Sequence, residues 1–249
     1  WVGDRKEDVG VKIEVTKLSS LNHWKHNASA GRIEHDTGKF FTIEGMGVRI
    51  ETIDEGVKEW SQPIINQPEI GYLGCIVKEF NGLLHFLVQA KIEPGNENIV
   101  QISPTLQATR SNYTKAHKGN SPKFLDYFNV SGKSKVLVDQ LQSEQGARFL
   151  SKRNRNIIVE VEEEIELTPE FKWLTLGQIK KLIGHDNVVN MDLRTVVSCI
   201  PIHESNHAVI QDSSAVISSS LSRGANMLTS ALNPNDGVES IVGIISWLT

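Results

Sequence analysis

Residues 89–113 combine amide, hydroxyl, acidic and cationic side chains directly after an apolar run that is typical of a strand. Because strand side chains alternate between two faces, His85, Gln89 and Lys91 are expected on one face of that strand. Further donors and acceptors follow at Gln101, Ser103, Thr105, Gln107, Thr109, Arg110, Asn112 and Tyr113. So many hydroxyl and amide groups favour a hydroxyl-rich ligand, such as a sugar, over a strand end that only meets solvent.

Cations concentrate around the alternation Arg-Asn-Arg-Asn at residues 153–156, in a chain whose formal net charge is −4. An apolar strand follows, so one pair of these residues is expected to face its buried side. Inward arginines require anionic partners, because guanidinium stays charged at physiological pH. Two interpretations stand equal: Arg153 and Arg155 bind a diphosphate through bidentate contacts, or they pair internally with Glu144 or Glu160.

Metal-binding and nucleophile motifs do not appear in the sequence. The eight histidines form no short-spaced pair with cysteine or glutamate except a loose pair, His203 and His207. A serine nucleophile motif with its strand-to-helix context is also missing. We therefore expect neither a metal site nor a cofactor.

Composition narrows the class of protein. The chain has 249 residues, of which 39% are hydrophobic and 22% charged, enough for a sizeable core. A net charge of −4 argues against nucleic acid or an anionic membrane as partner. Cys75 and Cys199 lie in apolar surroundings, which favours buried thiols in a reducing cytoplasm. No apolar run reaches membrane-spanning length, and the start at Trp1 suggests trimming or renumbering.

Three regions are expected along the chain. Residues 1–60 form an N-terminal segment, in which two alternating runs flanking Gly45–Gly47 predict a hairpin. Residues 61–201 form the core, and residues 202–249 a serine-rich linker with a C-terminal apolar docking segment.

The core pattern indicates an α+β fold with a mixed or antiparallel sheet and packed helices. Strands are expected at "EIGYLGCIVKEF", "LLHFLVQAKI" and "RNIIVEVEEEIEL". Helices are expected at "SPKFLDYFNV", "TLGQIKKLIG" and "NMDLRTVVSCI". The expected strands are joined by links of hairpin length, and the expected helices follow them in the sequence. This order disfavours a doubly wound sheet.

Six separated motifs resemble, in order and spacing, the NDP-hexose 2,3-dehydratases of deoxysugar biosynthesis. They are "WSQPIINQPEIGYLG", "LLHFLVQAKIEPGN", "QISPTLQATRSNY", "LQSEQGARFLSKRNRNIIVE", "FKWLTLGQ" and "NMDLRTVVSC". The resemblance implies a Nudix-like module that lacks the hydrolase's metal-binding motif. Family members usually carry two such modules, so this chain is expected to be an N-terminal half, a cleavage product or a one-module enzyme.

The resemblance implies elimination of water from an NDP-4-keto-6-deoxyhexose, most simply dTDP-4-keto-6-deoxyglucose. The C3 proton is acidic because it lies next to the C4 ketone, and the hydroxyl at C2 departs. Ionisable groups inside the matching motifs supply the roles: Glu144 or Glu93 as base, Lys91 as the cation for the enolate, and Tyr113 or His85 as acid.

Substrate binding is expected from the same motifs. Arg153 and Arg155 are candidates for the diphosphate, and the other proposed contacts are Gln107, Asn112, Arg110, Gln89 and Trp60. The resemblance further implies that a 3-ketoreductase consumes the product, and the apolar C-terminal segment favours a homodimer. The alternative is a non-catalytic nucleotide-sugar-binding module that supports a second, active half or a dimer.

Overall fold

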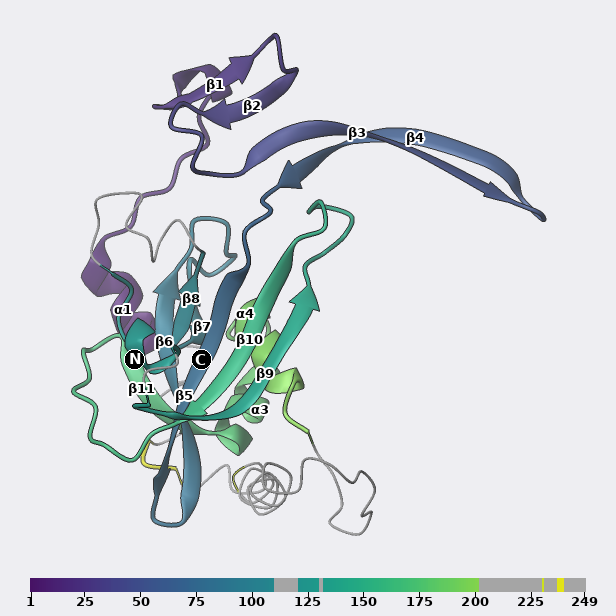
Figure 1. Cartoon of the computed structure of the whole chain (residues 1–249). Coiled ribbons are helices and arrows are strands. Elements are labelled where there is room, and N and C mark those ends of the chain that lie inside the picture. The colour runs from purple at the N-terminus through teal and green to yellow at the C-terminus, as the bar shows by residue number, and fades with distance from the viewer. Residues whose placement is uncertain (110–120, 130–131, 202–229, 231–236, 240–249) are drawn as a thin grey trace.

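The protein is represented by a computed structural model that describes residues 1–109, 121–129, 132–201, 230 and 237–239 (Figure 1). The strands of the first sheet, in spatial order and all antiparallel, are β1 (Trp24–Asn27), β2 (Arg32–His35), β3 (Thr42–Thr52) and β4 (Gly56–Asn66). The second sheet is larger and mixed. Its strands are β5 (Gly71–Phe80), β6 (Leu83–Ile92), β7 (Val100–Pro104), β8 (Leu106–Ala108), β9 (Lys135–Ser143), β10 (Arg153–Glu160) and β11 (Phe171–Thr175).

The larger sheet runs in the order β11-β6-β5-β10-β9, and only the β5–β10 pair is parallel. The α-helices that the structure describes along their length are α1 (Val2–Val9), α3 (Leu176–Ile183) and α4 (Met191–Ser198). This arrangement confirms the expected α+β class with a mixed sheet. Within the described residues, no helix has the length and apolar character needed to cross a membrane.

Strands β5 and β6 pair only near their shared turn and then separate, and the strand pair β7–β8 fills the gap between them. β7 pairs with β6, whereas β8 pairs with β5. At the crossover, the Thr105 hydroxyl accepts a hydrogen bond from Ile76 N at 3.0 Å and donates to the Leu87 carbonyl. This buried hydroxyl satisfies backbone groups that the diverging strands leave unpaired.

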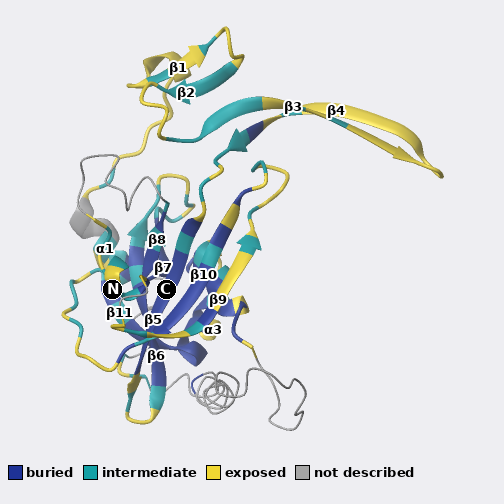
Figure 2. Ribbon diagram, in the orientation of Figure 1, coloured by how far each residue is buried: buried dark blue, intermediate teal, exposed yellow. Residues whose placement is uncertain are grey.

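Both faces of the larger sheet are covered (Figure 2). One face packs against α3 and α4 through fully buried residues such as Phe86, Leu182 and Leu193. The opposite face packs against Phe128 and the segment that leads to β11. Gly74 allows this second contact, because a Cβ there would lie 2.3 Å from the Phe128 ring.

The two main helices begin at well-formed caps. Thr175 and Gln178 form a reciprocal capping box at α3. Asn190 caps α4 through its side-chain oxygen, which accepts from Leu193 N at 2.9 Å. Asn190 N also bonds to the Ile102 carbonyl at 2.9 Å, so the start of α4 is held against β7. The helices predicted from "TLGQIKKLIG" and "NMDLRTVVSCI" are thereby confirmed.

Local predictions are wrong in three places. The strand expected to continue to residue 167 ends at Glu160. Gly45 and Gly47 lie inside β3, and the hairpin turn falls instead at residues 53–55, between β3 and β4. Of the helix expected at residues 121–130, the described part contains only a short 3₁₀ helix, Leu125–Tyr127. A second such turn spans Leu18–Ser20.

The β3–β4 hairpin projects from the body and its tip is exposed (Figures 1 and 2). Its base contacts the loop between β9 and β10, where Ile65 exchanges backbone hydrogen bonds with Arg148 and Leu150. Strand β4 therefore runs through the boundary expected between residues 60 and 61, and joins the N-terminal segment to the core. The C-terminal region 202–249 lies almost wholly outside the described residues.

Candidate functional site

A cavity of about 280 Å³ opens where the ends of β6, β8 and β10 approach the start of α4. We call it the central cavity. Its polar and charged lining residues include Lys91, Glu93, Gln107, Glu144, Lys152, Asn154 and Asp192. The structure thus brings together Lys91, Glu93, Glu144 and Gln107, four of the residues predicted from sequence, although they come from segments far apart in the chain.

Glu93 is held by two side-chain amides, one of which is itself held by a third. Gln107 Nε2 donates to one carboxylate oxygen at 2.7 Å, and Asn96 Nδ2 donates to the other at 3.1 Å. Asn190, the cap of α4, donates in turn to Gln107 Oε1 at 3.2 Å. Because both oxygens of Glu93 already accept hydrogen bonds, this carboxylate is well fixed and less available as a base.

Glu144 follows β9 and faces Asn154 of β10. Asn154 Nδ2 donates to Glu144 Oε2, and the backbone N–H of Glu144 donates to the Lys152 carbonyl at 2.9 Å. Gly71 on the neighbouring strand leaves room for this pair, since a Cβ there would lie 2.8 Å from Asn154 Oδ1. The carboxylate is consequently oriented by the sheet rather than by a mobile surface.

Asp192 is the acidic residue of this cavity that sequence reasoning missed. It lies in the first turn of α4 and is half-buried beside the other carboxylates. Burial, followed by the negative charges of Glu144 and Glu93, raises the pKa of Asp192 to about 6, while the charge of Lys91 opposes that rise. A carboxylate with this pKa is suited to take a proton near neutral pH.

Two lysines supply positive charge to the central cavity. Lys91 lies on β6, where it pairs in register with Gln101 of β7. Lys152 is only 4% exposed, and its ammonium group donates to the Glu69 carbonyl. Burial lowers the pKa of Lys152, although Glu69 and Glu144 act in the opposite direction. An ammonium group in such a site can stabilise a developing oxyanion.

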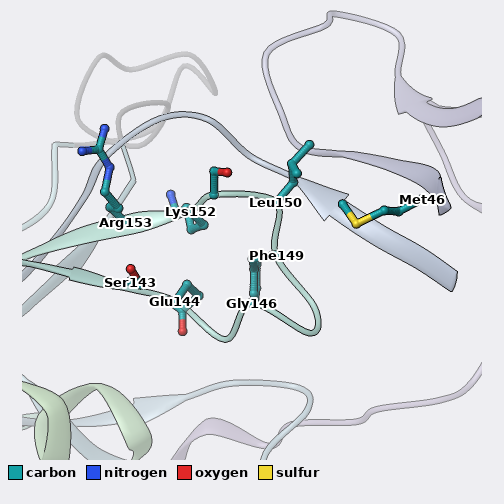
Figure 3. A pocket seen from close by; sticks show the side chains of 9 residues that line it. Met46, Ser143, Glu144, Gly146, Phe149, Leu150, Lys152 and Arg153 are labelled. Atoms are coloured by element: carbon teal, nitrogen blue, oxygen red, sulfur yellow. The ribbon is translucent and has the colours of Figure 1, made fainter. Parts of the chain in front are cut away.

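A larger hollow of about 550 Å³ adjoins the central cavity and shares Glu144, Phe149 and Lys152 with it. Figure 3 shows that the loop between β9 and β10 carries most of its labelled side chains, with Met46 of β3 at the far side. Arg153 lines this hollow and is exposed. Lys152 and Arg153 thus place two cationic residues along the larger hollow, and Lys152 also lines the central cavity.

Arg155 is occupied by an internal partner. Its guanidinium forms a fork with the Asp139 carboxylate, with one N–O distance of 2.6 Å, and donates to Tyr72 Oη at 3.1 Å. The same guanidinium lies over the Tyr72 ring, 5.3 Å from its centroid. The Asp139 contact raises the pKa of Arg155, which stays charged in this pair. The internal pairing weighed from sequence therefore occurs, with Asp139 as the acid rather than Glu144 or Glu160.

His85 lies away from the central cavity. Its side chain is 1% exposed, Nδ1 lies 2.9 Å from the Leu83 carbonyl, and Nε2 accepts from Val238 N at 3.2 Å. Burial lowers the pKa of His85, which favours the neutral form of the ring here. Gln89, on the same strand, is half-buried opposite Ser103 and Phe171 and does not line the cavity.

The remaining predicted contacts are not placed in the cavity by the structure. Trp60 is 44% exposed on the projecting hairpin, where its indole N–H donates to Gln62 Oε1 at 2.9 Å. Arg110, Asn112 and Tyr113 lie outside the described residues. Their proposed roles therefore stay predictions.

The two cysteines are buried and free, as expected from their apolar surroundings. Burial raises the pKa of the Cys75 thiol to about 12, so it is protonated and unreactive. Among the described residues, histidine, cysteine, aspartate and glutamate side chains form no group of three or more with the arrangement of a metal site.

Comparison with known proteins gives consistent matches. The family model described as NDP-hexose 2,3-dehydratase matches residues 1–200. Three curated relatives are each named dTDP-4-dehydro-6-deoxy-alpha-D-glucopyranose 2,3-dehydratase. The one from Saccharopolyspora spinosa is 52% identical over 82% of this chain and 42% of its own length. The one from Amycolatopsis orientalis is 47% identical over 82% of this chain and 44% of its own length. The one from Streptomyces violaceoruber is 44% identical over 81% of this chain and 45% of its own length. The chain thus spans less than half the length of these relatives.

Solved structures resemble the chain only weakly. An ADP compounds hydrolase matches 64% of this chain and 84% of its own, with 11% identity and a TM-score of 0.38. A Nudix hydrolase from M. smegmatis, RenU, matches 63% of this chain and 98% of its own, with 12% identity and a TM-score of 0.36. At such TM-scores and identities, these matches carry no argument about this chain.

Proposed function

Because the chain belongs to the NDP-hexose 2,3-dehydratase family, we propose that it eliminates water from a dTDP-4-keto-6-deoxyhexose. The observation that supports this most directly is the central cavity, where Lys91 lies among Glu93, Glu144 and Asp192. The reaction needs a base for the C3 proton and a cation for the enolate oxygen, and this cavity offers both.

In the proposed reaction, Asp192 removes the proton from C3 and the electron pair delocalises onto the C4 oxygen. The Lys91 ammonium stabilises the enolate, which then reforms the ketone as the C2–C3 double bond appears and the C2 hydroxyl departs. With a proton from an acid, that hydroxyl leaves as water, and the C3 enol tautomerises to a 3,4-diketo-2,6-dideoxy sugar. We assign the base to Asp192 ahead of Glu144 and Glu93, since Asp192 has the raised pKa and both oxygens of Glu93 already accept amide hydrogen bonds.

We keep Tyr113 as the proposed acid that protonates the departing hydroxide, although Tyr113 lies outside the described residues. The diphosphate is assigned to Arg153, beside Lys152, rather than to Arg155 with its Asp139 partner. A 3,4-diketo product is reactive, so we expect a 3-ketoreductase to consume it. The buried free thiols support a reducing cytoplasm as the protein's location.

A second candidate function is binding of the nucleotide sugar without chemistry. A module can retain its binding site when the chemistry lies elsewhere, and the residues that line the central cavity can serve binding as well as catalysis. Incubation of the purified chain with dTDP-4-keto-6-deoxyglucose, followed by NMR, distinguishes the two. Loss of the C2 hydroxyl supports the dehydratase, whereas an unchanged substrate that still binds supports the binding module.

Binding is predicted to be independent of metal. The diphosphate contacts proposed here are cationic side chains, so dTDP should stabilise the chain even in EDTA. At about 100 times its dissociation constant, a ligand adds about 2.7 kcal/mol, which corresponds to a rise of about 5–10 °C in melting temperature. A thermal shift that disappears with chelator and returns with magnesium would contradict the proposal.

We also propose that the chain forms a homodimer. The β3–β4 hairpin exposes Ile50, Ile53, Val57 and Trp60, with exposed fractions of 44%, 104%, 46% and 44%. A two-stranded ribbon is only marginally stable by itself, and exposed apolar groups favour association. Light scattering should therefore give twice the mass of the chain at micromolar concentration. A single-chain mass across that range would show that the hairpin is not a dimer contact.

A further inference from the structure

A third hollow, of about 230 Å³, adjoins the central cavity and has no role in the reaction described above. It shares Leu73, Glu144, Asn154 and Asp192 with that cavity, so a ligand in one can extend into the other. We call it the amide hollow, because its other lining residues include Gln142, Gln145 and Asn156.

Asn156 is the most unusual residue of the amide hollow. It lies on β10 with 0% exposure, and its Nδ2 donates to the Asn154 carbonyl at 3.2 Å. Its Oδ1 is buried and finds no hydrogen-bond partner in the described part of the chain. A buried acceptor without a donor is unfavourable, and such groups in folded proteins commonly serve a ligand or an ordered water.

The side-chain N–H groups of two neighbouring amides lie against sulfur atoms. Gln142 Nε2 lies 2.9 Å from the Cys199 sulfur, and Gln145 Nε2 lies 3.3 Å from the Met191 sulfur. Thiol and thioether sulfurs are weak acceptors, so both amides can rotate to a better partner at little cost. The hollow therefore presents one orphan acceptor and two adjustable amides to whatever enters it.

The lining of the amide hollow selects the kind of ligand. Its charged members, Glu144 and Asp192, are acids, and no lysine or arginine is among the described residues that line it, which disfavours a phosphate. No aromatic side chain lines it either, and a nucleobase would normally be stacked on one. A neutral hydrogen-bond donor on the sugar suits the site best.

We propose that the amide hollow binds a hydroxyl group of the hexose, with Asn156 Oδ1 accepting the hydrogen bond from the C3 hydroxyl. This assignment rests on the proposed function. A 4-keto-6-deoxyhexose linked to a nucleotide has free hydroxyls only at C2 and C3. The C2 hydroxyl must receive a proton as it leaves, and an amide oxygen has no proton to give, so Asn156 suits the hydroxyl that stays.

This contact would also orient the reacting bond. C3 carries both the hydroxyl and the proton that is removed, so fixing the hydroxyl fixes the direction of the C–H bond. Asp192 lines both the amide hollow and the central cavity, where it can meet that proton. Asn156 would therefore act as a substrate-binding residue that sets which hexoses react.

The test compares the binding of dTDP-glucose, dTDP-3-deoxyglucose and dTDP by calorimetry. In Asn156→Val, the affinity for dTDP-glucose should fall about tenfold, while the affinities for the 3-deoxy analogue and for dTDP stay unchanged. Gln140→Val is the matched control, because Gln140 pairs with Asn156 in register but is exposed and outside the hollow. It should leave all three affinities unchanged.

Several outcomes would overturn the assignment. An equal loss for dTDP would indicate a nucleobase or nucleotide contact, and an equal loss for the 3-deoxy analogue would exclude the C3 hydroxyl. If Asn156→Val does not fold, the parent chain still tests whether the C3 hydroxyl is bound. It must bind dTDP-3-deoxyglucose about tenfold more weakly than dTDP-glucose. These measurements need no turnover. A chain that shows this preference but never eliminates water would disprove the dehydratase proposal and leave the hydroxyl site intact.

Discussion

Replacing Asp192 by Asn is expected to lower turnover of dTDP-4-keto-6-deoxyglucose by about a hundredfold or more, with little change in dTDP affinity. The amide keeps the size of the side chain but cannot accept the C3 proton, and general bases contribute about 10²–10⁴-fold. The fold should persist, because the change removes one of several neighbouring negative charges around Glu144 and Glu93. Single-turnover kinetics and a melting curve check both expectations.

The pH dependence gives a second measure of the same residue. Because burial and the neighbouring glutamates raise the pKa of Asp192 to about 6, its carboxylate form prevails above that pH and is lost below it. The parent's kcat/KM should therefore fall about tenfold per pH unit below about 6. In Asp192→Asn this acidic limb should be absent from the residual activity.

Asp186→Asn is the matched control, since Asp186 is exposed in the loop before α4 and outside the central cavity. It should have parental turnover and a parental pH profile. Full activity in Asp192→Asn, with the acidic limb retained, would move the base to Glu144 or Glu93, the residues favoured from sequence. Loss of dTDP binding in Asp192→Asn would instead point to a role in ligand positioning.

The architecture of the core could be predicted where periodicity was strong. The apolar runs of β5, β6 and β10 are long and rich in aliphatic and aromatic residues, and the helix caps at Thr175 and Asn190 are local signals. The strand pair β7–β8, which fills the gap between β5 and β6, was not predicted. Its geometry depends on a buried threonine hydroxyl that replaces ladder hydrogen bonds, which is a tertiary effect with no local sequence pattern.

Some of the residues that line the central cavity could be predicted from the sequence, and others could not. Lys91 and Gln107 stood out because polar side chains follow an apolar run there, whereas Glu93 and Glu144 were selected as ionisable groups inside the motifs that carry the family resemblance. Asp192 did not stand out, because an acid in the first turn of a helix is ordinarily explained by the helix dipole. Only the docking of α4 against β7 shows that this turn faces a cavity with other carboxylates.

The arginine assignment shows a different limit. Alternation along β10 correctly placed Arg153 and Arg155 on one face of the sheet and Asn154 and Asn156 on the other. It could not show which of the two faces is covered by α4. Ile158 packs with the helix-covered face and Ile157 with the opposite face, so the asparagines share the face of α4. The partner of Arg155, Asp139, depends on the register of β9 with β10, which a sequence alone does not reveal.

Lys91→Met should separate transition-state stabilisation from ground-state binding. Methionine keeps most of the apolar stem but removes the charge, so turnover should fall about a hundredfold or more if Lys91 stabilises the enolate. Substrate affinity should barely change. Arg153→Met should do the reverse, weakening binding about three- to tenfold with little effect on turnover, because a diphosphate contact exists in both ground and transition states.

The charge of Lys91 has a further consequence for the pH profile of the reaction. Its positive charge lowers the pKa of Asp192, so Lys91→Met should raise that pKa and move the acidic limb of kcat/KM above pH 6. Lys135→Met, at an exposed end of β9, is the control and should shift neither turnover nor the limb. If Lys91→Met folds, keeps full turnover and leaves the limb in place, the enolate must be stabilised elsewhere, and Lys152 becomes the remaining cation of the central cavity to replace by Met.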